Sequence, residues 1–89
     1  MLETEITIIN KLGLHARAAA KLVKLVSGFD SHVEIGRPDN MVNAKSIMGV
    51  MMLAASRGSE LKITAEGEDE QEAMTAVIDL INDRFEEEE

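Results

Sequence analysis

His15 is the residue of this chain whose sequence neighbours best suit a nucleophile that accepts a phosphoryl group. It follows Gly13 and Leu14 and stands where a loop gives way to a helical pattern that begins at Ala16. The first turn of a helix has unpaired N–H groups and the positive end of the helix dipole, so it binds phosphate and favours a neutral imidazole. Neutral imidazole is the nucleophilic form of histidine. Arg17 adds a permanent charge and a fork of donors that match phosphoryl oxygens.

These residues alone leave a second interpretation open, because a histidine at a helix start is more often a cap or a surface residue. The small side chains of Ala16, Ala19 and Ala20 would leave room for another protein to approach. The pattern is therefore compatible with a phosphoryl group that is held on a ring nitrogen and exposed for onward transfer.

The elements that must position His15 follow from hydrophobic periodicity, which alternates in strands and repeats every three or four residues in helices. Gly28 fits the left-handed position that ends a helix. Ser46 fits an N-cap, and Asp69 with Glu72 fits a capping box. The expected elements are a strand over 2–9, a helix over 16–27, a hairpin of strands over 32–36 and 41–43, a helix from 46 to 53 or 54, a strand over 61–65 and a helix from 69 to 85.

That order, β-α-β-β-α-β-α, predicts an α+β fold of the open-faced sandwich kind, with the helices packed on one face of the sheet. A length of 89 residues allows one hydrophobic core. We expect a single domain over 1–85 and an acidic, frayed and solvated tail over 86–89. A monomer is the default expectation.

The net charge of −8 is unevenly spread. Residues 60–89 hold twelve acidic and two basic residues, whereas residues 1–59 hold five acidic and seven basic ones. An acidic chain without Trp or Tyr is a poor match for nucleic acid, because it repels phosphates and offers few stacking surfaces. We therefore expect any anion site in the first two-thirds of the chain. Its basic residues would be Arg17, Lys21, Lys24 and Lys45, around His15.

Other composition features exclude several classes of site. The absence of cysteine excludes disulfides and thiolate metal sites, and it agrees with an expected location in the reducing cytoplasm. The two histidines lack the spacing of metal ligands, so we expect no metal and no cofactor, and we expect His32 to face solvent. No apolar run is long enough for a membrane span and no signal peptide is apparent, so we expect no membrane association.

Two segments resemble the HPr family, the histidine phosphocarriers of the bacterial phosphotransferase system. Gly-Leu-His-Ala-Arg at 13–17 is similar to the family's active-site motif. Lys-Ser-Ile-Met-Gly-Val-Met-Met-Leu at 45–53 is similar to the segment around its regulatory serine. The resemblance covers residues 2–85, and the spacing from His15 to Ser46 also matches. It implies a four-stranded antiparallel sheet with three helices on one face.

The resemblance implies a cycle of phosphoryl transfer and not the turnover of a small molecule by an enzyme. Enzyme I, charged by phosphoenolpyruvate, would phosphorylate Nδ1 of His15, and an enzyme IIA protein would then receive the phosphoryl group. The N–H groups of Ala16 and Arg17 would meet the phosphoryl oxygens. Most relatives have proline where this chain has Ala18. Alanine keeps the helix and restores one N–H, so we expect the phosphate site to persist.

Ser46 has two compatible roles. As an N-cap it would contribute roughly 0.5–2 kcal/mol. The resemblance implies that HPr kinase/phosphorylase modifies it. A phosphate there would add about −1.5 to −2 charge units and would be tolerated by the helix dipole. We expect this charge to weaken docking on acidic partner surfaces.

The resemblance also implies an apolar docking patch with a basic rim around His15. Such patches mark interaction sites, and adaptable methionine side chains suit a carrier with several partners. The residues expected there are Ala20, Lys24, Ile47, Met48 and Met51. Packing in the core is the competing interpretation, which we apply to Val50, Met52 and Leu53.

Three functions remain open: a phosphocarrier, a regulatory protein that acts through its Ser46-phosphorylated form with little or no transport role, and a small ligand-binding module with an ordinary His15. Within the family, the Ser46 segment looks more like the kinase-regulated, sugar-transporting branch. The segment 10–13 and the acidic end look closer to the nitrogen branch.

Overall fold

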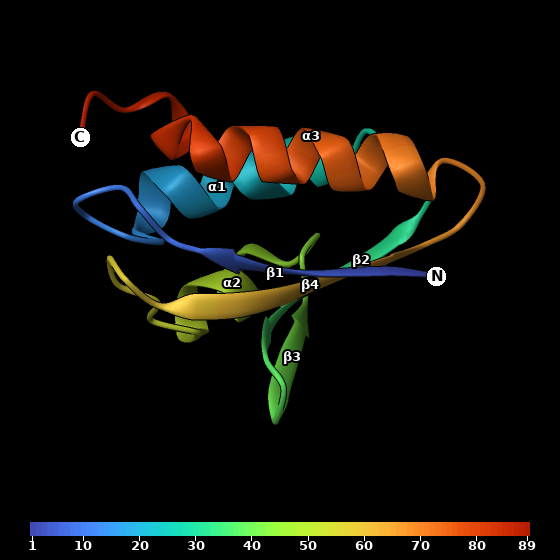
Figure 1. Cartoon of the computed structure of the whole chain (residues 1–89), viewed down its shortest axis with the longest axis horizontal. Coiled ribbons are helices and arrows are strands. Elements are labelled where there is room, and N and C mark those ends of the chain that lie inside the picture. The colour runs from blue at the N-terminus through green and yellow to red at the C-terminus, as the bar shows by residue number, and fades with distance from the viewer.

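The computed structural model describes every residue from Met1 to Glu89 and shows a four-stranded sheet with three α-helices (Figure 1). The strands lie in the order β1-β4-β2-β3, and every pairing is antiparallel. This confirms the predicted α+β fold and the order of its elements. The elements are β1 (Leu2–Thr7), α1 (Ala16–Val26), β2 (His32–Arg37), β3 (Asn40–Asn43), α2 (Ile47–Met52), β4 (Glu60–Glu66), α3 (Glu70–Asn82) and a 3-10 turn η1 (Arg84–Glu86).

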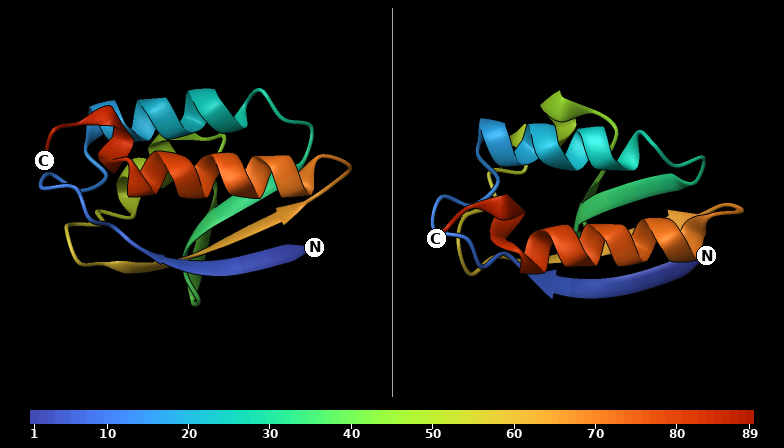
Figure 2. Two further views of the ribbon diagram at one scale, coloured as in Figure 1. Left: turned by 45° about the horizontal axis from the view of Figure 1, so that its top comes forward. Right: turned by 90° about the horizontal axis from the view of Figure 1, so that it is seen from above.

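Helices α1 and α3 lie side by side over one face of the sheet, and the shorter α2 packs against α1 and β3 (Figure 2). The C-terminal segment returns to the loop that joins β1 to α1, at the end of the molecule where α1 begins (Figure 2). None of the helices combines the length and the apolar character that crossing a membrane requires.

The alternation along the strands places their apolar side chains under the helices. Leu61 and Ile63 of β4 are buried, and Ile63 lies opposite Ile35 of β2 in the sheet register. Apolar residues at helical spacing form one stripe along α1, which includes the buried Leu22 and Val26. Burial of this stripe fixes the rotation of α1 and leaves its basic face in solvent.

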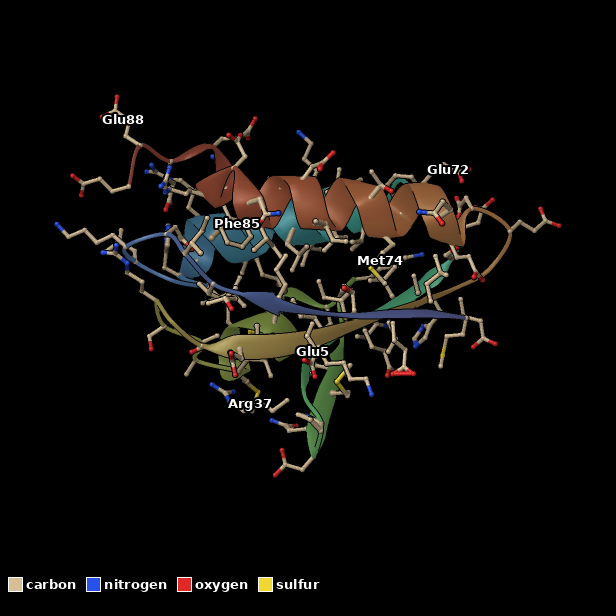
Figure 3. The ribbon with its side chains drawn as sticks, in the orientation of Figure 1. Glu5, Arg37, Glu72, Met74, Phe85 and Glu88 are labelled. Carbon is tan, nitrogen blue, oxygen red and sulfur yellow. The ribbon has the colours of Figure 1, made fainter.

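The C-terminal end differs from the sequence-based expectation. Helix α3 ends at Asn82, and Arg84, Phe85 and Glu86 all have positive φ, so the chain turns back toward α1. The turn brings Phe85 into the core with no exposed surface (Figure 3). The expectation of a frayed, solvated segment is wrong for Glu87, whose side chain is only 17% exposed.

The predicted capping box at the start of α3 is also wrong. Asp69 occupies the N-cap position, but its side chain makes no capping hydrogen bond. Its carboxylate instead accepts hydrogen bonds from the N–H groups of Asp30 and Ser31 and from the Ser31 hydroxyl. These bonds, chiefly that from the hydroxyl, hold the pKa of Asp69 below its ordinary value. They tie the start of α3 to the start of β2.

Candidate functional site

His15 is the N-cap residue of α1, as its position in the sequence predicts. Its backbone is extended, with φ −72° and ψ 177°, and its Nδ1 accepts a hydrogen bond from the Arg17 N–H at 3.3 Å. The carbonyl of His15 accepts from Ala19 N–H and so starts the helical ladder. The imidazole is therefore fixed at the positive end of α1, and 26% of its side chain is exposed.

The loop before His15 is held by a close backbone approach. The Leu14 N–H donates to the Ala55 carbonyl at 2.8 Å. Gly13 has φ +67°, and a Cβ at this position would lie 2.4 Å from the same carbonyl oxygen. Only glycine fits both the conformation and the space, so Gly13 sets the position of the next two residues.

The Nε2 side of the His15 ring lies against the carboxylate of Glu87. Oε1 of that carboxylate accepts a hydrogen bond of 3.0 Å from Nδ2 of Asn10, a fully buried side chain that also donates to the Gly13 carbonyl at 2.8 Å. Burial on its own would raise the pKa of Glu87. The hydrogen bonds from Asn10 and His15, the charge of His15 when its ring is protonated and the charge of Lys21 outweigh it and lower that pKa.

Basic side chains lie around one side of the site. Arg17 is exposed, and with Lys11 and Lys21 it borders a shallow hollow that the glutamates of 86–89 also line. The Lys21 ammonium donates to the Phe85 carbonyl at 2.8 Å. Arg17 and Lys21 thus lie where the sequence predicted a basic edge to the site.

Lys45 does not belong to this basic edge. Its ammonium donates to the Phe29 carbonyl at 2.8 Å, beyond the C-terminal end of α1. Eleven helical residues, or roughly 16 Å at 1.5 Å per residue, separate that end from His15. The expectation that Lys45 lies around His15 is therefore wrong, because Lys45 precedes α2 at the end where α1 stops.

Ser46 is exposed and caps α2, since its Oγ accepts a hydrogen bond of 3.2 Å from the Gly49 N–H. Ser46 directly follows Lys45, whose side chain contacts the segment after the C-terminal end of α1. The other end of α2 leads to Ala55, whose carbonyl accepts a hydrogen bond from Leu14, next to His15. Ser46 and His15 therefore lie toward opposite ends of the contact between α1 and α2.

Apolar side chains that face solvent gather on α2. Ile47, Met48 and Met51 are 40%, 65% and 39% exposed, and Ala20 and Lys24 of α1 are exposed as well. Val50 and Leu53 are buried as expected, but Met52 is 76% exposed, so its assignment to the core is wrong. A helix of six residues is too short for its hydrophobic period to define one buried face.

Sequence patterns do not single out two residues of the site, Asn10 and Glu87, or the exposure of Leu12 and Met52. Asn10 and Leu12, which is 66% exposed, lie in the segment 10–13 between two predicted elements, and Glu87 lies in the predicted tail. The four consecutive glutamates at 86–89 carry no signal that singles out Glu87. A polar residue before a glycine loop is the only hint that Asn10 is structural.

Comparisons with known proteins agree on one family. The family profile described as the PTS HPr component phosphorylation site matches residues 2–83. Phosphocarrier protein HPr of Pseudomonas aeruginosa is 57% identical over 84 residues, which cover 93% of each chain. The same protein of Cupriavidus necator is 58% identical over 85 residues, or 96% of each chain. The crystal structure of HPr-C-His from Thermoanaerobacter tengcongensis superposes with a TM-score of 0.95 at 49% identity over the whole of both chains.

Proposed function

The chain belongs to the HPr family and is a phosphocarrier of the phosphotransferase system, not a classical enzyme, and we propose that His15 Nδ1 is the atom that carries the phosphoryl group. Membership of the family implies enzyme I as the donor and an enzyme IIA protein as the acceptor. The observation that carries the assignment of His15 is its place as the N-cap of α1, where Nδ1 accepts a hydrogen bond from the Arg17 N–H in the first turn of the helix.

The transfer follows from this geometry. The Nδ1 lone pair attacks phosphorus while the phosphorus–nitrogen bond to the donor histidine of enzyme I breaks and returns its electron pair to that nitrogen. Once Nδ1 is bonded to phosphorus, it no longer accepts from the Arg17 N–H, which becomes free to bind a phosphoryl oxygen. The N–H of Ala16 and the guanidinium of Arg17 are the other donors that we assign to those oxygens.

Partners dock on the exposed apolar residues of α2 and on the basic edge of α1. The patch adjoins the site, because α2 packs on α1 and the loop after α2 bonds to Leu14. Its residues are Ala20, Lys24, Ile47, Met48 and Met51, to which Met52 is added because it lies exposed on α2. Methionine side chains can repack against enzyme I and enzyme IIA in turn.

Ser46 is a second, regulatory phosphorylation site, for which HPr kinase/phosphorylase is the proposed enzyme. Its hydroxyl is exposed, and its position at the N-terminus of α2 tolerates a phosphate. Because Ser46 lies away from His15 and next to Ile47 and Met48, the added charge would act on docking and not on the imidazole. A Ser46→Asp variant should then accept phosphate from enzyme I more slowly than wild type, and an unchanged rate would contradict inhibition.

The test of His15 uses phosphoenolpyruvate labelled in its phosphoryl group, together with enzyme I. Wild type should take up acid-labile label and pass it to an enzyme IIA protein, and His15→Ala should take up none. His32→Ala is the matched control, because His32 is the other histidine and is exposed on β2 beside Glu34. It should be labelled like wild type. Measuring which enzyme IIA protein receives the label, a sugar-type or a nitrogen-type one, identifies the branch of the family to which the carrier belongs.

The second candidate function is a regulatory interaction protein with little or no transport role, and the exposed Ser46 beside an apolar patch favours it. Incubation with ATP and the serine kinase separates the two. Label at Ser46 without any label at His15 in the enzyme I reaction would support the regulator and contradict the carrier. We propose that the carrier acts as a monomer in the cytoplasm, which sedimentation of the purified protein and cell fractionation would test.

A further inference from the structure

The carboxylate of Glu87 lies against the side of the His15 ring that takes no part in the proposed transfer. Its side chain is 17% exposed, whereas that of Glu89 is 71% exposed and Glu88 projects away from the fold (Figure 3). Glu87 contacts Nε2, and the Nδ1 side of the ring faces the start of α1. The contact therefore leaves the proposed acceptor atom free.

Glu87 is held in place by contacts that do not involve His15. Phe85 anchors the preceding turn in the core, and its carbonyl accepts from Lys21 at 2.8 Å. Asn10, with no exposed surface, donates to Glu87 Oε1 at 3.0 Å. Asn10 also donates to the carbonyl of Gly13 in the loop before His15. One buried amide thus fixes both the carboxylate and the loop that carries the imidazole.

Two contacts of the ring define where its hydrogen lies. An ionised carboxylate is an acceptor only, so Nε2 must be the donor in its contact with Glu87. Nδ1 accepts from the Arg17 N–H, which requires a lone pair on Nδ1. The first contact places a hydrogen on Nε2 and the second leaves Nδ1 without one, so the two together define the neutral tautomer with the hydrogen on Nε2. The lowered pKa of Glu87 agrees with an ionised carboxylate at neutral pH.

We propose that Glu87 is a positioning residue for phosphoryl transfer, because its carboxylate holds the hydrogen of His15 on Nε2 and so keeps the Nδ1 lone pair available. This inference rests on the proposed role of Nδ1 as acceptor. When Nδ1 forms its bond to phosphorus, the ring keeps the Nε2 hydrogen and gains positive charge, and the carboxylate stabilises that charge. No proton has to leave the ring. A buried carboxylate orients the histidine of a Ser-His-Asp triad by the same physics.

The experiment compares Glu87→Ala and Glu87→Gln with Glu88→Ala as the matched control. Glutamine has the shape of glutamate, but its amide can accept from Nε2–H or donate to an Nε2 lone pair, so it does not select a tautomer. The first measurement is the pair of ring ¹⁵N chemical shifts of His15 at a pH where the ring is neutral. The second is the rate of phosphorylation by phosphorylated enzyme I.

We expect wild type and Glu88→Ala to show one tautomer with hydrogen on Nε2. Both Glu87 variants should move the ring shifts toward those of a free histidine side chain and slow phosphorylation on the order of tenfold, the factor that a charge-assisted hydrogen bond supplies. Ring shifts unchanged from wild type in both variants would overturn the proposal, and so would a wild-type rate in both.

The outcomes also separate this inference from the proposed function. If His15 takes up label at the wild-type rate in both Glu87 variants, the carrier function stands and the role of Glu87 is refuted. If wild type takes up no label at His15, the proposed function fails, and with it the role of Glu87 in transfer. A cooperative unfolding transition in each variant shows that slower transfer does not come from loss of the fold.

Discussion

Replacing Gly13 by alanine should destabilise the protein and displace His15. Residue 13 has φ +67°, which costs a non-glycine residue about 1–2 kcal/mol. The new Cβ would also lie 2.4 Å from the Ala55 carbonyl oxygen, so the two backbone segments must separate. Separation breaks the hydrogen bond from Leu14 to that carbonyl, and an unsatisfied buried partner costs about 1–3 kcal/mol.

We therefore expect Gly13→Ala to lower the free energy of unfolding by about 2–5 kcal/mol, out of the ~4–13 kcal/mol expected for 89 residues. Gly58→Ala is the matched control. Gly58 has φ +91°, but no atom lies within 4 Å of the Cβ position, so only the conformational cost of about 1–2 kcal/mol applies.

Urea unfolding followed by far-ultraviolet circular dichroism measures both changes, since the chain has no Trp or Tyr for fluorescence. The rate of phosphorylation by enzyme I, measured where both variants are folded, reports the position of His15. It should fall in Gly13→Ala and stay at the wild-type value in Gly58→Ala. Equal losses of stability in the two variants would show that the close approach to Ala55 does not hold the loop.

Three other substitutions test separate contacts. Phe85→Ala removes a fully buried ring and should cost about 3–5 kcal/mol in urea unfolding, and a loss below 1 kcal/mol would show that the turn after α3 is not anchored in the core. Asp69→Asn weakens three hydrogen bonds. Because the folded-state pKa of Asp69 is depressed, its contribution is present above the ordinary value of 3.8 and is lost as pH falls through the folded value. The difference in unfolding midpoint from wild type should therefore be largest near neutral pH and shrink below about pH 4, and a difference independent of pH would contradict this role. Ser46→Ala removes the cap of α2 and should cost about 0.5–2 kcal/mol, and no change in the midpoint would mean that the bond to Gly49 contributes nothing.

Local patterns were enough to predict most of the elements and the place of His15. Strand alternation identified β1 and β4, because each strand has one face under the helices. The stripe that ends at Val26 identified α1 and so placed His15 at its start. These predictions succeeded because the physics that fixes them acts within one turn of helix or between alternate residues of a strand.

What the sequence did not predict depends on contacts between distant segments. Glu87 reaches His15 only because three consecutive non-glycine residues after α3 adopt positive φ and turn the chain back. Burial of the Phe85 side chain stabilises that turn. Asp69 is a residue type that often caps helices, yet its carboxylate accepts hydrogen bonds from Asp30 and Ser31, in the loop just before β2. Lys45 directly precedes Ser46, and α2 runs so that its N-terminal end lies at the C-terminal end of α1, which places Lys45 far from His15.

The position of phosphorus on the imidazole is the most direct test of the proposed mechanism. Protein labelled with ¹⁵N-histidine is treated with phosphoenolpyruvate and enzyme I, and the ring nitrogens are observed by nuclear magnetic resonance. We predict that Nδ1 of His15 couples to phosphorus, that Nε2 keeps its hydrogen, and that His32 is unchanged. Phosphorus on Nε2 of His15 or on His32 would contradict the mechanism.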